Sequence, residues 1–501
     1  MKGCFVLQRR FVYVGHELVA LLKERGVIEE SCAYVVGREG RDLLASQKEV
    51  QYTTVALDED FFKRSLREPI DLPFLKKFEE EHGVLWKFIN VDRVVRQGQL
   101  VREYPYDKAP YSYEEMLRLV QGYAKHIETF LTQENPDFVF MFQPASLGTL
   151  ILYSIAKKRG IPTYLTYVPS TRNLVVLSEV YERLSGVEKK LKKHEHTPLT
   201  KIPMYKEARE FIREFREKPF TYSKVVVSRE RNGAWGQFDF LLPWKLPRAI
   251  YYNFFEIIFE WLRDREKRTD YTTVNPFLHI YDRTKRKVRN LIGQKGLYDA
   301  YDLAQPFVFF PLTYEPEMAI LLYAPYDTDQ LQIAHKLARS LPVGMYLYVK
   351  DHPQMAPFRP RNYYKELKKI PNVRLLDHSV SSFDLEKHAA LVALINSTPG
   401  WEATLLGKPV ITFGHAFYNT LSSVQHSKTP EELPRLIRDA LKQGGCPEEE
   451  LTRFVAALFE DGASLDLMQL WEQAESKRAR REGLVGFADL LAKKIATVRG
   501  A

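Results

Sequence analysis

Short apolar runs alternate with amphipathic segments of helical spacing along most of this chain. In the first 200 residues the pattern predicts strands at 4–7, 32–36, 137–142 and 162–168, and helices at 14–24 and 147–159. The stretch from about 58 to 133 predicts mostly helix, most clearly at 113–132. Strands that alternate with helices are typical of parallel sheets covered by helices.

The same alternation returns after Gln305, with more regular spacing. The pattern there predicts strands at 307–310, 345–349, 373–376, 391–395 and 410–413, and helices at 329–340, 363–369, 383–390 and 401–406. Between the two halves, 187–300 predicts helices and no alternating strands.

These patterns predict an α/β protein with two Rossmann-like parallel-sheet domains and a helical insertion or connector. We expect an N-terminal α/β domain on the acceptor side at 1–200, a helical basic and aromatic connector at 201–304, and a C-terminal α/β donor domain with terminal helices at 305–501. Two such α/β halves predict a cleft between them, which is a favoured place for a small-molecule site.

Composition narrows the class of protein. With 501 residues, 45% hydrophobic and 27% charged, the chain is typical of folded globular proteins and too long for one core. No run of about 18 apolar residues predicts a membrane span, and the N-terminus lacks the apolar core of a signal peptide. The cysteines are few, odd in number and far apart (Cys4, Cys32 and Cys446), which favours a reducing compartment. We therefore expect a cytoplasmic protein, with peripheral contact at the inner face of the plasma membrane left open.

The positive charge is concentrated in one stretch. Of the net charge of +9, the segment 243–296 carries +6, from twelve basic and six acidic residues. Aromatic residues gather in the same stretch, among them Trp244, Tyr251, Tyr252, Phe254, Phe255, Phe259 and Trp261. This combination predicts either contact with an anionic membrane surface or a helix that packs on the protein with a solvated basic face. Nucleic-acid binding is disfavoured, because no RRM, KH or helix-turn-helix signature accompanies the charge.

One motif joins a strand directly to a helix start. The predicted strand 391–395 runs into Asn396-Ser397-Thr398-Pro399-Gly400. Pro399 suits the first helical position, which makes Thr398 the expected N-cap and leaves unpaired N–H groups for an anion. Gly400 would let a ligand approach the backbone, and Glu402, in the first turn, could accept hydrogen bonds from sugar hydroxyls. A capped helix without a ligand is the alternative.

Two further motifs follow strands of the same predicted sheet. Lys350-Asp351-His352-Pro353 ends the strand at 345–349, so its ionisable side chains should face the ligand crevice. His352 can donate a hydrogen bond to a phosphate. Tyr314, Glu315 and Glu317 lie on a proline-bounded loop after the strand at 307–310, where an ordinary acidic loop is the alternative.

Taken together, the order of these motifs resembles a known family. The order is Pro-Leu-x-Tyr-x-Pro-Glu at 311–317, Lys-Asp-His-Pro at 350–353, Asn-Val-Arg-Leu-Leu at 372–376 and Asn-Ser-Thr-x-Gly-x-Glu-Ala-x-x-x-Gly-Lys-Pro-Val at 396–410. It resembles the capsule polysaccharide biosynthesis family of bacterial Kdo transferases and related surface-carbohydrate glycosyltransferases. The resemblance is strong at about 305–418, weaker at 72–93 and 136–172, and poor across 187–296.

The resemblance implies a GT-B fold that binds a nucleotide-sugar donor, often a CMP-sugar, in the C-terminal domain. It implies that His352, Ser397 and Thr398 hold the donor phosphate, with Glu402 near the ribose. The full donor set that we expect is Lys350, His352, Asn396, Ser397, Thr398, Gly400, Glu402, Tyr314 and Glu317.

The acceptor half carries weaker signals. Glycosyl transfer commonly needs a carboxylate that takes the acceptor proton or a group that stabilises the departing phosphate. The catalytic candidates are Glu39, Asp42 and Asp92 together with His352, and Arg172 is a candidate anion-binding fork. Each of the first-half candidates has a structural role as its alternative.

No Asp-x-Asp pair lies at a convincing strand end, and Asp327-Thr-Asp329 predicts a helix cap instead. We therefore expect no metal or other cofactor, with the nucleotide-sugar as a co-substrate.

The predicted function is glycosyl transfer from a nucleotide-sugar, such as a CMP-linked Kdo-like sugar, to a surface polysaccharide or glycolipid. Three alternatives remain at this point. One is a teichoic-acid-type polyol-phosphate transferase with a CDP-linked donor, and a more distant one is a GT-B sugar epimerase. The third is a membrane-associated polysaccharide assembly factor without catalytic activity.

Overall fold

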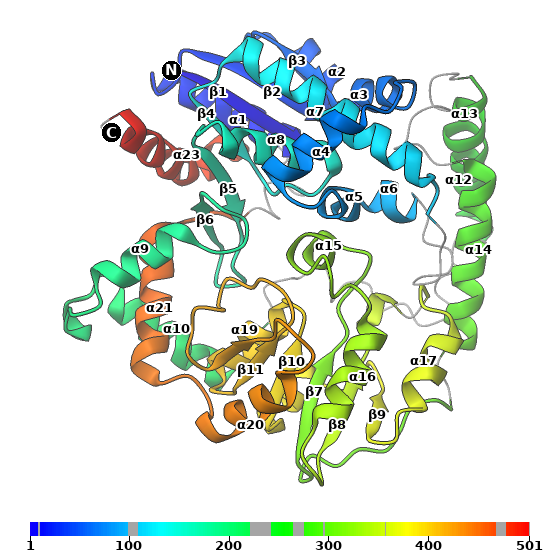
Figure 1. The fold of residues 1–501 in the computed structure, drawn as a ribbon, viewed down its shortest axis with the longest axis vertical. Helices are drawn as coiled ribbons and strands as arrows, with labels where there is room; N and C mark the ends of the chain where they lie inside the picture. The colour runs from blue at the N-terminus through cyan, green and yellow to red at the C-terminus, as the bar shows by residue number, and fades with distance from the viewer. Residues whose placement is uncertain are drawn as a thin grey trace. The chain divides into compact units, whose positions relative to one another are not determined.

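The computed structural model describes residues 1–8, 11–98, 109–220, 242–263, 275–293, 296–355, 357–466 and 477–499. They form two compact units. The first unit comprises Met1–Val95, Tyr111–Glu210 and Thr452–Ala501, and the second comprises Arg96–Pro110 and Phe211–Leu451. Each unit contains one sheet with helices around it (Figure 1). The prediction of an α/β protein with two Rossmann-like sheets is confirmed.

The sheet of the first unit has seven strands in the order β13-β6-β5-β4-β1-β2-β3. The strands are β1 (Lys2–Gln8), β2 (Glu30–Val36), β3 (Val55–Leu57), β4 (Phe138–Met141), β5 (Thr163–Tyr167), β6 (Leu174–Ser178) and β13 (Gly462–Ser464). Strands β1 to β5 pair in parallel, whereas β6 and β13 join one edge antiparallel. The four predicted strands are confirmed. The other three were not predicted; β3 and β13 are too short to show a clear alternation.

The sheet of the second unit has six strands, all parallel, in the order β12-β11-β10-β7-β8-β9. The strands are β7 (Phe307–Pro311), β8 (Tyr346–Lys350), β9 (Val373–Leu376), β10 (Leu391–Leu394), β11 (Val410–Thr412) and β12 (Val424–His426). All five predicted strands of this half are confirmed, because fully buried parallel strands read as continuous apolar runs.

Helices fill the connections between these strands. In the first 220 residues they are α1 (Phe11–Glu24), α2 (Arg38–Ser46), α3 (Asp58–Ser65), α4 (Leu72–His82), α5 (Trp86–Val91), α6 (Arg93–Gln97), α7 (Tyr113–Glu134), α8 (Leu147–Lys158), α9 (Ser185–Lys193) and α10 (Tyr205–Glu217). The longest of these, α7, begins with a capping box between Ser112 and Glu115.

The remaining helices follow in chain order. They are α12 (Leu246–Tyr251), the π-helix η3 (Tyr252–Phe259), α13 (Glu260–Arg263), α14 (Pro276–Ile292), α15 (Met318–Tyr323), α16 (Gln330–Ser340), α17 (Arg361–Lys368), α18 (Ser382–His388), α19 (Thr398–Leu405), α20 (Leu433–Gln443), α21 (Glu448–Asp461) and α23 (Lys477–Arg499). The described part of 187–300 contains helices and no strand, as predicted.

The last helix, α23, belongs to the first unit although it is far from it in sequence. Leu484, Phe487 and Leu491 lie in the same buried cluster as Phe140 of β4, and the Phe140 and Phe487 ring centroids are 6.0 Å apart. Figure 1 shows α23, in red, beside the blue strands of the N-terminal sheet. The predicted C-terminal domain, 305–501, included this helix. In the structure, α23 belongs to the first unit instead.

Two cysteines that are distant in sequence are neighbours in the fold. Cys4 of β1 and Cys32 of β2 are paired in register, and both are buried free thiols. A hydrogen bond between them and burial raise the pKa of Cys4 well above its ordinary value. Among the described helices, none combines the length and the apolar character needed to cross a bilayer.

Candidate functional site

The connections of the second sheet reverse direction between β7 and β10. From β7 the chain runs outward through β8 to β9, and the later strands run from β10 outward through β11 to β12 on the other side. In such sheets, ligands bind outside the carboxyl ends of the strands at the point of reversal. The segments that follow β7, β8 and β10 meet at this edge, so the fold brings together the three motifs that the sequence analysis selected.

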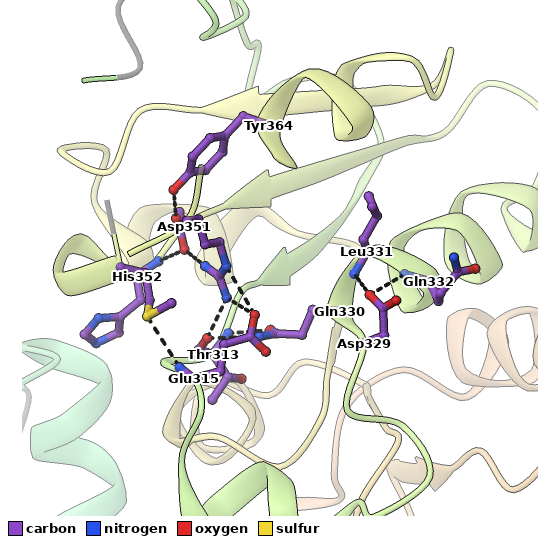
Figure 2. Close-up of polar contacts among 11 residues, drawn as sticks. Thr313, Glu315, Asp329, Gln330, Leu331, Gln332, Asp351, His352 and Tyr364 are labelled. Carbon is purple, nitrogen blue, oxygen red and sulfur yellow. Dashed lines mark hydrogen bonds and ion pairs between the residues drawn. The ribbon is translucent and has the colours of Figure 1, made fainter. Parts of the chain in front are cut away.

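A buried arginine ties the first two of these segments together. Arg359 is only 1% exposed, and its guanidinium donates to Glu315 Oε1 at 2.5 Å and to the Thr313 carbonyl oxygen at 3.0 Å. It also forms an ion pair with the Asp351 carboxylate. Figure 2 shows Thr313 and Glu315 on one side of this network and Asp351 with Tyr364 on the other. The loop after β7 and the turn after β8 are therefore fixed to each other.

One guanidinium faces two carboxylates in this buried network. Although burial lowers the pKa of Arg359, the Asp351 and Glu315 carboxylates raise it more, and the net pKa lies well above its ordinary value. Tyr364 Oη donates to Asp351 Oδ2 at 2.5 Å, so the second carboxylate oxygen is also bound. Sequence reasoning missed Arg359, because nothing in its local pattern reveals that the chain returns it to these carboxylates.

The turn after β8 sets the orientation of His352. The His352 backbone N–H donates to Asp351 Oδ1 at 2.7 Å, and the Gln354 backbone N–H donates to His352 Nδ1 at 3.2 Å. Because Nδ1 accepts a hydrogen bond, the neutral ring carries its proton on Nε2. Figure 2 shows the His352 ring directed away from the Asp351 carboxylate. Its Nε2–H is thus the atom suited to donate to a ligand.

The loop after β7 supplies one aromatic neighbour of this histidine. The ring centroids of Tyr314 and His352 are 5.7 Å apart and meet edge to face. Tyr314 also lies 6.0 Å from the Phe358 ring. Glu317 is exposed and lies at the N-cap position of α15 without a side-chain capping bond. Of the two predicted residues on this loop, Tyr314 contacts His352, and no contact of that kind is found for Glu317 in the described part.

The helix start after β10 differs by one residue from the prediction. Ser397 is the N-cap of α19, so Thr398 is the first helical residue and Pro399 the second. Pro399 is tolerated there, because the N–H groups of the first turn have no partner within the helix. The Ser397 hydroxyl does not cap the helix; it is a buried oxygen with no hydrogen-bond partner in the described part of the chain.

The neighbouring Asn396 fixes this turn to the loop after β7. Its Nδ2 donates to the Ala319 carbonyl oxygen of α15 at 2.7 Å, whereas its Oδ1 has no hydrogen-bond partner in the described residues. Unpaired buried polar atoms are uncommon in folded proteins, so each calls for a physical reason. Two of them, on Asn396 and Ser397, lie at the predicted phosphate position.

Gly400 has a packing role besides the one predicted. A Cβ atom at this position would lie 2.2 Å from Tyr418 Oη and 2.7 Å from Leu394 Cδ2. The protein itself therefore fills the space where a side chain would begin at Gly400, and a close ligand approach to its backbone stays a prediction. The glycine is needed because α19 packs tightly against β10 and Tyr418, whose hydroxyl donates to the Ser397 carbonyl oxygen.

Glu402 lies deeper than predicted and shares its surroundings with a second carboxylate. It is the fifth residue of α19, beyond the first turn, and it is buried. Burial raises the pKa of Glu402 to about 7. Glu386 of α18 is fully buried and its carboxylate oxygens have no hydrogen-bond partner in the described residues.

Lys350 provides the opposite charge near this pair. Burial and the Glu402 carboxylate raise the pKa of Glu386, and Lys350 opposes that rise. Lys350 Nζ donates to Ser382 Oγ at 2.7 Å, one helical turn before Glu386. The predicted donor residues Lys350 and Glu402 thus belong to one buried cluster. Glu386 was not selected from the sequence, since a charged residue in an amphipathic helix normally faces solvent.

The candidates of the first unit are spread along its own sheet. Glu39 and Asp42 lie in α2, after β2, where Tyr13 Oη donates to Glu39 Oε1 at 3.2 Å and Arg41 pairs with Asp42 at 3.0 Å. Arg172 is exposed between β5 and β6, with a positive φ of 47° and its guanidinium 5.7 Å from the Phe459 ring. Strands β1 and β4 separate the two places.

Asp92 is buried and engaged by backbone amides. Its Oδ1 accepts from the N–H groups of Val94 at 2.9 Å and Val95 at 3.2 Å, and its Oδ2 accepts from Leu147 N–H at 3.1 Å. The side chain therefore holds the starts of α6 and α8, which is the structural alternative stated above for this residue. Its catalytic role stays a prediction.

The Asp-x-Asp sequence is a helix cap, as predicted. Asp329 Oδ1 accepts from the backbone N–H groups of Leu331 at 3.0 Å and Gln332 at 3.2 Å (Figure 2). Asp327 pairs with Lys336 at 3.0 Å. In the part of the chain that the structure describes, no group of three His, Cys, Asp or Glu side chains is arranged to hold a metal ion.

Comparison with solved structures gives only weak likenesses. Thermosulfurimonas dismutans KpsC, beta Kdo 2,7 transferase, is 13% identical with a TM-score of 0.37, covering 69% of this chain and 83% of that chain. UDP-GlcNAc 2-epimerase from Neisseria meningitidis is 11% identical with a TM-score of 0.23, covering 92% and 99%. Likenesses at these scores do not establish a shared function.

Comparison of sequences is more informative. Protein FixF of Sinorhizobium fredii (strain NBRC 101917 / NGR234) is 32% identical over 164 residues, which are 32% of this chain and 39% of FixF. The chain thus matches about two fifths of the length of that relative. The family described as "Capsule polysaccharide biosynthesis protein" matches residues 263–432, which include His352, Ser397 and Glu402. That match covers about a third of this chain and lies within the second unit.

Proposed function

We propose that this chain is a glycosyltransferase that binds a nucleotide-activated sugar at the carboxyl edge of its second sheet. The observation that carries the proposal is that His352 and the start of α19 follow β8 and β10 at one edge of the sheet, beside the point where the strand order reverses, within the segment matched by the capsule polysaccharide biosynthesis family. A CMP-linked sugar is the proposed donor, and a surface polysaccharide or glycolipid is the proposed acceptor.

The chemistry of this edge suits a phosphate. The first N–H groups of α19 and the positive end of its dipole favour an anion. His352 Nε2–H can donate to a phosphate oxygen, and the unpaired Ser397 hydroxyl lies at the same helix start. As the bond from the sugar to the phosphate breaks, negative charge grows on that phosphate, and these fixed donors would stabilise it.

The rigid network below the edge would keep the donors in place. Arg359, Glu315 and Asp351 join the two loops, so His352 need not be ordered when the ligand binds. Preorganised donors stabilise a transition state more than mobile ones, because no reorganisation is needed during the reaction. In this proposal Lys350 and Glu402 support the nucleotide from the buried side of the same edge.

Replacement of His352 tests the proposal. We expect His352→Ala to lower donor turnover by about 100-fold or more, since one lost donor to a developing charge commonly has that effect. His352→Gln retains an N–H near the Nε2 position and should recover part of the loss. His335 is a half-buried histidine of α16, so His335→Ala is the matched control and should leave turnover unchanged.

A thermal-shift series with CMP, CDP, UDP and GDP identifies the nucleotide. A ligand that binds only the folded protein at about 100 times its Kd stabilises it by about 2.7 kcal/mol. We expect one cytidine nucleotide to raise the melting temperature of the wild type and of His335→Ala, but not of His352→Ala. If no nucleotide shifts the wild type, or if His352→Ala turns over the donor normally, the proposal is wrong. Product analysis separates a transferred sugar from a transferred polyol phosphate.

A further inference from the structure

The basic and aromatic part of the chain has its apolar side chains facing outward. We call the described residues 242–263 and 275–293 the aromatic-basic surface; they comprise α12, η3, α13 and α14 with their flanking residues, and all lie in the second unit. Large apolar residues here are exposed, with Trp244 at 72% and Phe277 at 60%. The alternative of a helix packed through its aromatic residues is therefore contradicted.

Helix α14 shows the inversion most clearly. Phe277, Tyr281, Val288 and Ile292 follow helical spacing along one face, and all four are exposed. The opposite face packs on the protein through charged groups. Asp282 is buried and pairs with Arg286, whose guanidinium lies 4.2 Å from the centroid of the Phe358 ring.

Two further contacts hold this charged face in place. Arg289 Nη1 donates to the Phe358 carbonyl oxygen at 2.7 Å, and Arg361 Nη1 donates to the Gly293 carbonyl oxygen at 2.9 Å. A helix of a globular protein normally buries its apolar stripe and exposes its charges. Because α14 does the reverse, its apolar stripe is available for something other than the core of this unit.

The preceding helices extend the same surface. The exposed rings of Tyr251, Phe255 and Phe259 form a ladder, with successive ring centroids 5.1 Å and 6.3 Å apart. Trp261 meets Phe277 edge to face at 6.3 Å, so the two helical segments touch at this point. Exposed apolar patches of this extent mark interaction sites rather than ordinary surface.

The charge of the surface indicates what binds there. It contains eight basic and three acidic residues, a net charge of +5. Helical spacing places Lys285 and Lys287 on opposite sides of the apolar stripe of α14. Lys285 Nζ lies 5.6 Å from the centroid of the Tyr281 ring. Aromatic side chains between basic ones suit the headgroup region of an anionic bilayer, where rings enter the acyl boundary and cations meet lipid phosphates.

We propose that the aromatic-basic surface binds an anionic phospholipid bilayer as a peripheral, interfacial anchor. The charge argues against a second copy of this chain as the occupant, because two positively charged faces would repel each other. A nucleic acid would satisfy the basic groups and leave the apolar stripe exposed, because such interfaces are mainly polar. The proposal does not depend on the glycosyltransferase assignment, since no residue of that site takes part in it.

Vesicle sedimentation with the full chain tests this anchor. We expect binding to vesicles of phosphatidylcholine with about 30% phosphatidylglycerol and little binding to phosphatidylcholine alone, because the charge of the surface needs anionic lipid. Binding should fall steeply as salt rises toward about 1 M, where the Debye length shrinks to about 3 Å.

Two sets of substitutions separate the apolar and the charged contributions. Phe255→Ser, Phe259→Ser and Phe277→Ser together should lower the partition coefficient about 1,000-fold, since each buried ring contributes about tenfold or more. The control for this variant combines Tyr326→Ser and Val343→Ser, which remove equally exposed apolar groups elsewhere in the second unit.

The charge variant combines Arg283→Gln, Lys285→Gln and Lys287→Gln. It should lower partition by about fivefold for each charge removed. The matched control removes three exposed lysines of the first unit, Lys192→Gln, Lys193→Gln and Lys201→Gln, and should bind as the wild type does.

The proposal is overturned if the wild type fails to bind anionic vesicles at low salt, or if the aromatic variant binds as well as the wild type. It is also overturned if sedimentation velocity shows a dimer that the aromatic variant dissociates while vesicles stay unbound, because the surface would then join two copies. Melting temperatures close to that of the wild type are expected for all variants, since every substituted side chain is at least partly exposed.

Discussion

The two sheets reverse their strand order at equivalent places, between β1 and β4 in one unit and between β7 and β10 in the other. Where the first sheet reverses, neutral amides join the ends of β1, β4 and β5: Gln8 Nε2 donates to the Gln143 carbonyl oxygen at 2.8 Å, and Gln143 Nε2 donates to the Thr166 carbonyl oxygen at 2.7 Å. In the second unit, buried ions occupy the corresponding edge, centred on Arg359. The topology selects the place, and the residues that fill it decide the chemistry.

This difference has a consequence for what each edge can do. The amide ladder of the first unit carries no charge. The second edge combines fixed charges with a helix start, the His352 donor and the Ser397 hydroxyl, which has no hydrogen-bond partner within the described residues. An anionic ligand therefore finds donors ready at the second edge, which is why we place the nucleotide there.

The largest loss of stability is expected when the buried ion pairs at the second edge are broken. Arg359→Met removes the guanidinium that pairs with both Glu315 and Asp351, and it leaves two buried carboxylates without this cation. Loss of one partner of a buried ion pair typically costs about 3–5 kcal/mol. Urea unfolding of the variant should show this loss, whereas Arg339→Met, at an exposed position of α16, should change the free energy of unfolding little. A loss below about 1 kcal/mol would contradict a structural role for Arg359.

A second effect appears only as the pH is changed. Burial raises the pKa of Glu402 from its ordinary value of 4.5 to about 7, so the folded protein retains that proton more strongly than the unfolded chain does. The stability that this provides is complete below about pH 4.5 and is lost as the pH rises to about 7. Above pH 7 the difference amounts to about 3 kcal/mol.

Glu402→Gln should remove this dependence. We expect the variant to gain stability relative to the wild type between pH 5 and pH 8, by up to about 3 kcal/mol, in unfolding curves recorded at both values. Glu431→Gln, at an exposed position, should follow the wild type at every pH. A constant difference between Glu402→Gln and the wild type across this range would show that the carboxylate pair does not titrate as described.

The smallest of these losses of stability is expected for the amide ladder of the first unit. Gln143→Leu leaves the Thr166 carbonyl oxygen without its side-chain donor, and an unsatisfied buried acceptor costs about 1–3 kcal/mol. Thermal unfolding measures the change, and Gln133→Leu on the exposed face of α7 is the control. If Gln143→Leu cost as much as Arg359→Met, the two edges would not differ in the way described here.

Much of the fold could be predicted because apolar periodicity is a local signal. The strands of the second sheet are buried on both faces, so β9 at Val373–Leu376 was predicted with its exact bounds. Short or edge strands such as β3 and β13 were missed, since three residues carry almost no periodicity. The start of α19 was displaced by one residue because Pro399 is compatible with either of the first two helical positions.

The candidate site divides in the same way. The sequence by itself determined which segments follow the strands, and hence that His352 and Ser397 lie at one sheet edge. Only the tertiary structure decided that Arg359 joins Glu315 to Asp351, that Glu386 faces Glu402, and that the space beside Gly400 is already filled. It also decided that α14 exposes its apolar face. The physical reason is that helical or strand periodicity fixes which side chains share a face, whereas the partner of that face depends on loops that bring distant segments together.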